Sequence, residues 1–301
     1  MEEVTEVLIH QSDMAAYNRC PAEFGYRRAG IAGKQTSASA YGSVMHFALQ
    51  VFERVRVEEG FDLGVRKAKE TFRFYWNPMH IEAICEPVPA KGWLPRQGYS
   101  ELLSRGSDAI DKYADLIRFD DHELLATEYA FYVPVVGSWD YELDMPHYLA
   151  GSVDRLAARH YSRALAVCVD DFKTGKEQKY LRHNLQFTAY CYATTQLDFW
   201  TGGGIENGFG EKRGTELFER FANAGRRGTW INMRLFKFQD AGWRGPIDYQ
   251  RFALACDQLA LAIQSNIYPL TLNGESCTFC SHRETCGTTG VAPDDHGKPG
   301  A

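Results

Sequence analysis

The segment from Leu165 to Lys173 most constrains the fold, because it is an apolar strand that ends in charged side chains. Alternate residues share one face of a strand, so an acid at 171 and an amine at 173 follow apolar residues on the same face. An unpaired charge on a buried face is costly, which predicts that Asp171 and Lys173 meet a metal or a substrate. A surface Asp–Lys pair on a hairpin is the alternative explanation.

A second expected strand carries Gly151-Ser152-Val153-Asp154-Arg155. If it forms a hairpin with segment 164–172, Asp154 lies near Asp171. Two carboxylates on adjacent strands are hard oxygen ligands that suit Mg²⁺ or Mn²⁺. A divalent ion at such a place can polarise a phosphoryl oxygen, and a neighbouring lysine can stabilise developing charge.

The order of the expected elements indicates an α/β fold built in layers, with helices first, then a mixed sheet, then helices. Ser12 is the expected cap of the first helix, and Pro21 interrupts it. The glycine-rich stretch 201–214 is expected to be a loop. Helices are expected over 12–20, 23–28, 41–59, 62–76, 99–119, 181–197 and 247–266, and strands over 124–135, 148–159, 164–172 and 229–238.

The composition is that of an ordinary globular chain. Hydrophobic residues make up 45% and charged residues 24% of 301 residues, which excludes disordered, collagen-like and coiled-coil proteins. There is no apolar run of about 18 residues, and the acidic N-terminus does not resemble a secretory signal, so we expect a cytoplasmic protein. The net charge of −6 argues against a basic surface over the whole molecule and still allows a local basic groove.

Three of the eight cysteines crowd into a turn-forming segment: Cys277, Cys280 and Cys286. Thiolates at this spacing suit zinc or an iron–sulfur cluster, and Cys20 is a candidate fourth ligand. The spacing alone does not distinguish the two metals, and unrelated surface thiols are the remaining alternative. Three other cysteines are expected in the core as small hydrophobic residues: Cys168, Cys191 and Cys256.

Together these motifs resemble the PD-(D/E)XK nuclease superfamily in its RecB-like branch, over about residues 12–286. The resemblance rests on Asp154, on segment 169–176, and on two helices: Gly42-x-x-x-His46 and Gln186-x-x-x-Tyr190. Cys20-Pro21-Ala22-Glu23-Phe24 and the C-terminal cysteines are similar to iron–sulfur members, including CRISPR-associated and phage-encoded nucleases. The sequence departs from many members in having Asp171 rather than Glu.

The resemblance implies a restriction-endonuclease-like fold, with a mixed central sheet flanked by helices. We expect a helical N-terminal region over 1–125, a nuclease core over 126–270 and a cysteine segment over 271–286. The Gly-, Pro-, Thr- and Asp-rich composition of residues 287–301 predicts a disordered tail. The N-terminal region would carry Cys20 and His46.

The resemblance also implies a role for each site residue. The metal ligands would be His46, Asp154, Asp171 and the backbone carbonyl of Phe172, with the histidine favouring Mn²⁺. Lys173 would orient or activate water, Gln186 would position Lys173 or the phosphate, and Tyr190 would contact the DNA backbone or an acid. Glu128 is a candidate further acid, although a solvated strand-end glutamate is the favoured interpretation.

The implied function is a metal-dependent DNA exonuclease, acting on single-stranded ends and containing a structural [4Fe–4S] cluster. The alternatives are a non-catalytic DNA-end binding or CRISPR-adaptation factor, and a zinc-stabilised protein of the same fold. Protein partners in recombination, replication or CRISPR adaptation fit each of them. Basic residues near aromatic ones suit a path for single-stranded DNA, with charged strand edges as the alternative: Arg27, Arg28, Arg226, Arg227 and Trp230.

Overall fold

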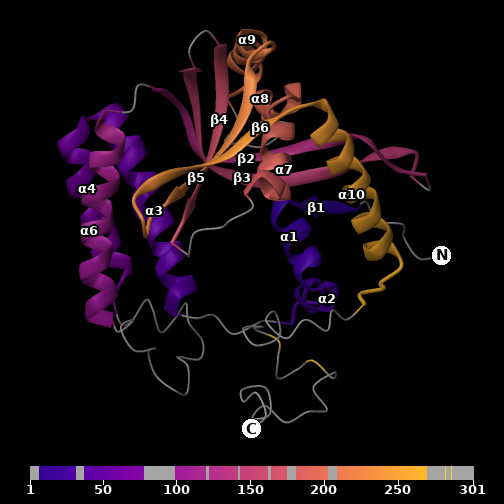
Figure 1. Ribbon diagram of the computed structural model, residues 1–301, viewed down its shortest axis with the longest axis horizontal. Coiled ribbons are helices and arrows are strands. Elements are labelled where there is room, and N and C mark those ends of the chain that lie inside the picture. The colour runs from indigo at the N-terminus through magenta and orange to yellow at the C-terminus, as the bar shows by residue number, and fades with distance from the viewer. Residues whose placement is uncertain are drawn as a thin grey trace.

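A mixed six-stranded sheet forms the centre of the protein (Figure 1). The computed structural model describes residues 7–31, 37–77, 99–119, 122–141, 143–161, 164–174, 181–202, 209–269, 282 and 286. The strands are β1 (Leu8–His10), β2 (His122–Asp140), β3 (Met145–Tyr161), β4 (Ala164–Lys173), β5 (Gly225–Asn232) and β6 (Lys237–Arg244).

The long strand β3 organises the sheet. Antiparallel β2 pairs along one of its edges, and the other edge is shared by antiparallel β4 and by β1, which pairs parallel with residues 148–150. Beyond β4 lie parallel β5 and antiparallel β6. The N-terminal region therefore contributes a strand to the sheet, and the observed mixed sheet confirms the predicted fold class.

Helices cover both faces of the sheet. Figure 1 shows α3, α4 and α6 grouped on one side and α1, α7 and α10 on the other. No helix within the described ranges is long and apolar enough to cross a bilayer. The helices are α1 (Gln11–Arg19), α2 (Pro21–Arg28), α3 (Ser37–Glu58), α4 (Phe61–Tyr75), α6 (Tyr99–Arg118), α7 (Leu185–Ala193), α8 (Leu197–Thr201), α9 (Glu211–Phe221) and α10 (Pro246–Gln264).

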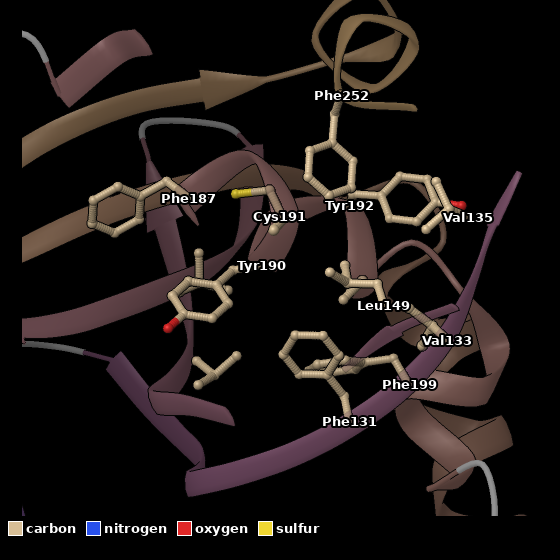
Figure 2. Close-up of a cluster of buried hydrophobic side chains, with 14 of the residues drawn as sticks. Phe131, Val133, Val135, Leu149, Phe187, Tyr190, Cys191, Tyr192, Phe199 and Phe252 are labelled. Atoms are coloured by element: carbon tan, nitrogen blue, oxygen red, sulfur yellow. The ribbon is translucent and has the colours of Figure 1, made fainter. Parts of the chain in front are cut away.

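Two hydrophobic cores lie between these layers. One packs Val167 and Val169 of β4 against α7, α8 and α10, and Figure 2 shows part of it around Phe131 and Phe199. The other packs Phe172 against α3, α4 and α6. Residues of opposite parity on β4 therefore enter different cores, which confirms the alternation expected of this strand.

The structure corrects several expected boundaries. Segment 229–238 is part of a hairpin rather than one strand: β5 ends at Asn232, whose side chain accepts hydrogen bonds from the backbone of Arg234 and Leu235. Alternation continues across this Asx turn, so periodicity alone does not reveal it. Helix α9 begins inside the stretch expected to be a loop, and β1 was not expected. The cap of α1 is His10 instead of Ser12, and the expected tail over 287–301 lies outside the described residues.

Candidate active site

The expected hairpin brings the two aspartates to neighbouring strands. Arg155 of β3 pairs with Asp170 of β4, so Asp154 and Asp171 follow on the same pair of strands. The Asp154 Oδ2 atom accepts a hydrogen bond of 2.7 Å from the backbone N–H of Phe172. Both carboxylates are buried, with Asp154 8% and Asp171 1% exposed.

Asp171 is the centre of a polar group at the end of β4. The Lys173 Nζ atom lies 2.9 Å from Oδ1 and 2.7 Å from Oδ2 of this carboxylate. Gln186 Nε2 lies 3.2 Å from the same Oδ1 and donates a 2.8 Å hydrogen bond to the Tyr190 hydroxyl. Gln186 thus contacts Asp171 directly. Gln11 of α1 also donates to the Tyr190 hydroxyl, at 3.5 Å.

Helix α7 places Gln186 and Tyr190 in this group. Asn184 caps α7 by accepting a hydrogen bond of 2.8 Å from the Gln186 N–H, so the helix begins beside Asp171. Gln186 and Tyr190 are four residues apart and share a helix face. The Tyr190 ring packs in the core, and Figure 2 shows its hydroxyl directed away from Phe199 and Phe252.

A second group of ligand atoms surrounds Asp154. One ligand atom each of His46, Glu128 and Asp154 lies within 4.8 Å of the others. His46 comes from α3, its Nδ1 atom is 3.3 Å from Asp154 Oδ2, and its ring packs edge-on against Phe172. Two carboxylates suit Mn²⁺ or Mg²⁺ and an imidazole favours Mn²⁺, so these residues fit a divalent cation.

Glu128 enters this group through a distortion of β2. Its φ is 45°, and it lies between two regular pairs, Thr127 with Arg155 and Tyr129 with Val153. Glu128 is half-buried inside a strand that begins at His122, so the interpretation as a solvated strand-end residue is wrong. An irregular backbone conformation in a strand is not encoded in residue periodicity, which is why the sequence pattern did not assign it.

The electrostatics show a crowded negative site. Burial raises the pKa of Asp171 to about 6, and the charge of Asp154 adds to this while Lys173 opposes it. Burial and the charge of Asp154 also raise the pKa of Glu128 to about 7. Burial would lower the pKa of His46, but its hydrogen bond to Asp154 and the charge of Asp154 outweigh this and raise it.

The amine of Lys173 is a cation at neutral pH. Burial acts to lower its pKa, but the adjacent Asp171 carboxylate outweighs burial, and the pKa lies above the ordinary lysine value. A protonated amine cannot accept a proton from water. Lys173 is therefore suited to stabilise negative charge that develops on a substrate.

Replacing Glu128 with glutamine should stabilise the metal-free protein mainly at alkaline pH. A carboxyl group whose pKa is raised on folding contributes stability below its unfolded pKa, and this contribution is lost as pH rises through the folded pKa of about 7. We expect Glu128→Gln to raise the unfolding free energy by about 1 kcal/mol near about pH 8, and by less near about pH 5, after allowance for solvent screening. Urea unfolding in a chelator measures this, and an equal effect at both values would contradict it.

Two of the expected DNA-contacting residues lie in the interior, so that assignment is corrected. Arg226 is 6% exposed and donates to the backbone carbonyls of Phe221 and Thr194, and Trp230 is 3% exposed in the core. Arg227 is partly exposed but is paired with Asp240 at 2.9 Å. A buried arginine needs several acceptors, and Arg226 finds backbone carbonyls within the protein. Arg27 and Arg28 are on the surface of α2.

Seven of the eight cysteines divide into two groups, and Cys85 lies outside the described residues. Cys168, Cys191 and Cys256 are buried in the core, as their sequence environment predicts. Cys20 lies at the junction of α1 and α2, where it is the N-cap of α2. Cys277 and Cys280 lie outside the described residues, but the C-terminal segment returns to α2: His282 is buried, its ring stacks on Tyr26, and its carbonyl accepts from the Cys286 N–H.

Comparison with known proteins identifies the class to which this sheet and its acidic site belong. The sequence matches the PD-(D/E)XK nuclease superfamily over residues 10–287, and the chain belongs to this superfamily of metal-dependent nucleases. No curated protein matches it. A solved structure titled "Crystal structure of SSO0001" is 12% identical, with a TM-score of 0.36, and the match covers 95% of this chain and 89% of that one.

Proposed function

We propose that the protein is an exonuclease that hydrolyses single-stranded DNA from its ends, within the RecB-like branch of the superfamily. The observation that carries the nuclease proposal is the joint placement of a carboxylate–imidazole group and a lysine–carboxylate pair at the end of one hairpin. Such a pairing provides cation binding and charge stabilisation around one phosphodiester.

In this proposal His46, Glu128 and Asp154 hold a divalent ion, with Asp171 and the Phe172 carbonyl beside them. The ion, when bound, would polarise the scissile phosphoryl oxygen and lower the pKa of water. Lys173 stabilises the negative charge that develops on the phosphate. Gln186 orients Asp171 through its 3.2 Å contact and is itself held by Tyr190. The product would carry a 5′-phosphate.

End-labelled and circular DNA substrates test the proposal. The protein, with Mn²⁺ or Mg²⁺ added, should degrade linear single strands progressively from an end and leave circular single strands intact. A chelator should abolish the reaction. Cleavage of circles would instead make the protein an endonuclease, and binding of DNA ends without cleavage in either metal would make it an end-binding factor, as in CRISPR adaptation.

We also propose that Cys20, Cys277, Cys280 and Cys286 hold a structural [4Fe–4S] cluster. Support comes from α2, which has Cys20 as its N-cap and packs through Tyr26 against His282, four residues before Cys286. This contact brings His282 to the helix that follows Cys20. Free thiols stay reduced in the cytosol, which is where we expect this enzyme to act.

Replacing Cys20 with serine should remove the cluster. Anaerobically purified wild-type protein is expected to be brown, because thiolate-bound iron absorbs visible light, and Cys20→Ser should lose most of its iron and colour. Iron and zinc analysis measures this, and Cys256→Ser, in the core, is the matched control. A colourless wild type containing zinc would overturn the iron–sulfur proposal and leave the nuclease proposal untouched.

A further inference from the structure

A buried group of charged side chains lies directly beside the proposed catalytic residues. It consists of Glu53 on α3, Arg155 on β3 and Asp170 on β4, and all three are 0% exposed. Arg155 forms an ion pair with Asp170 through Nη1, and its Nε atom lies 3.3 Å from Glu53 Oε1. One guanidinium group thus joins three separate elements in the interior.

Each of these elements also carries a residue of the proposed metal site. Arg155 follows Asp154 on β3, and Asp170 precedes Asp171 on β4. Glu53 lies seven residues after His46 on α3, which is two helical turns along the same side. The contacts of Arg155 therefore join the same three elements that carry His46, Asp154 and Asp171.

The surroundings of Glu53 complete the group. Arg56 donates to Glu53 Oε2 at 2.6 Å, and the Tyr113 hydroxyl of α6 donates to Oε1. Burial acts to raise the pKa of Glu53, but Arg155 and Arg56 outweigh it and the pKa is lowered, so Glu53 is ionised. Phe172, whose N–H holds Asp154, packs between Tyr113 and His46.

A buried ion pair often adds little net stability, since desolvation offsets the attraction between its charges. A guanidinium group is well suited to holding three elements in one arrangement, because it is a rigid planar fork and its contacts with two carboxylates fix where both must lie. The neighbouring polar shell of a metal site can orient the ligands themselves.

We propose that Arg155, together with Glu53 and Asp170, is a positioning residue that sets the geometry of the divalent-metal site by holding α3, β3 and β4 in register. The proposal rests on the proposed metal-dependent function and deepens it. Arg155 does not touch the substrate in this role. It acts through His46, Asp154 and Asp171.

Direct titration with Mn²⁺, followed by the electron paramagnetic resonance signal of the unbound ion, tests this assignment. The Mn²⁺ binding that is lost in Asp154→Asn is the binding at the proposed metal site. Arg155→Met should weaken this binding by about 10- to 100-fold, as expected for loss of a group that orients metal ligands. Arg155→Lys, which keeps the charge but cannot reproduce the fork, should lie between Arg155→Met and wild type. DNA binding measured in a chelator should be unchanged.

Arg226→Met is the matched control, because Arg226 is a buried arginine on β5 that donates hydrogen bonds to backbone carbonyls away from the site. We expect it to lower the melting temperature and to bind Mn²⁺ with wild-type affinity. Wild-type affinity in folded Arg155→Met would overturn the proposal, as would equal weakening in the Arg226 variant.

A second variant keeps the test decisive if Arg155→Met does not fold. Glu53→Gln, Arg155→Met and Asp170→Asn combined remove the three fully buried charges together, and Arg56, the other cation beside Glu53, is partly exposed to solvent. Weak Mn²⁺ binding in this folded triple variant supports positioning, and wild-type binding refutes it. If wild type binds Mn²⁺ at Asp154 but cuts no DNA, the nuclease proposal fails while the positioning proposal is still tested by the metal affinities.

Discussion

Replacing Lys173 with methionine is expected to lower the rate of DNA cleavage by about 10²- to 10⁴-fold. The amine is a cation held 2.7 Å from Asp171, so its removal takes positive charge away from the position where the phosphate would react. Methionine keeps much of the apolar stem of the side chain, which lets the fold persist. Single-turnover cleavage of labelled single strands, with saturating Mn²⁺, measures the effect.

The matched control is Lys67→Met on α4. Lys67 is exposed and pairs only at the surface with Glu70 at 3.0 Å, so its loss should leave cleavage unchanged. Binding of the Lys173 variant to DNA in a chelator should remain near that of wild type. If binding and cleavage fell together, Lys173 would be a charge contact for DNA rather than a residue of the chemical step.

Replacing Asp154 with asparagine is expected to have the second large effect, abolishing both metal binding and activity. Asp154 lies in the cluster of possible metal ligands with His46 and Glu128. It also accepts a hydrogen bond from the Phe172 N–H, next to Asp171 on the paired strand. Loss of the cation removes several kcal/mol of transition-state stabilisation, or about 10³-fold or more in rate. Calorimetric titration with Mn²⁺ and a cleavage assay measure the two losses.

Asparagine is the informative replacement because its amide oxygen can still accept the hydrogen bond from the Phe172 N–H. The thermal stability of the metal-free variant should therefore match that of wild type or exceed it, since one of several crowded negative charges has gone. Asp111→Asn, on the surface of α6, is the control. Tight Mn²⁺ binding by Asp154→Asn would mean that the ion lies elsewhere.

The local elements could largely be predicted from the sequence, because each depends on the periodicity of its own residues. The alternation along β4 and the helical spacing of α3 place Asp171 and His46 on definite faces without reference to any partner. The positions that failed have non-repetitive backbone. The turn after Asn232 has a positive φ at Phe236, and β2 is distorted by a positive φ at Glu128. The alternation of polar and apolar residues does not predict either backbone angle.

Exposure of charged and aromatic residues was the second limit of prediction. Arg226 and Trp230 are residue types that are common in DNA-binding surfaces, but on β5 both side chains are buried in the interior. A central strand is covered on both faces, so the alternate residues of β5 have no solvent side. The sequence of β5 by itself does not predict that other elements cover both faces of this strand.

The sequence alone predicted the α/β class and the hairpin that pairs Asp154 with the strand of Asp171. It also assigned four further residues to the motifs of one nuclease family: His46, Lys173, Gln186 and Tyr190. The tertiary structure decided which of these side chains touch: Gln186 contacts Asp171, Glu128 joins His46 and Asp154, and Arg155 links three elements beneath them. The physical reason is that periodicity assigns a side chain to a face of its own element. The distance between side chains on different elements depends on how those elements pack.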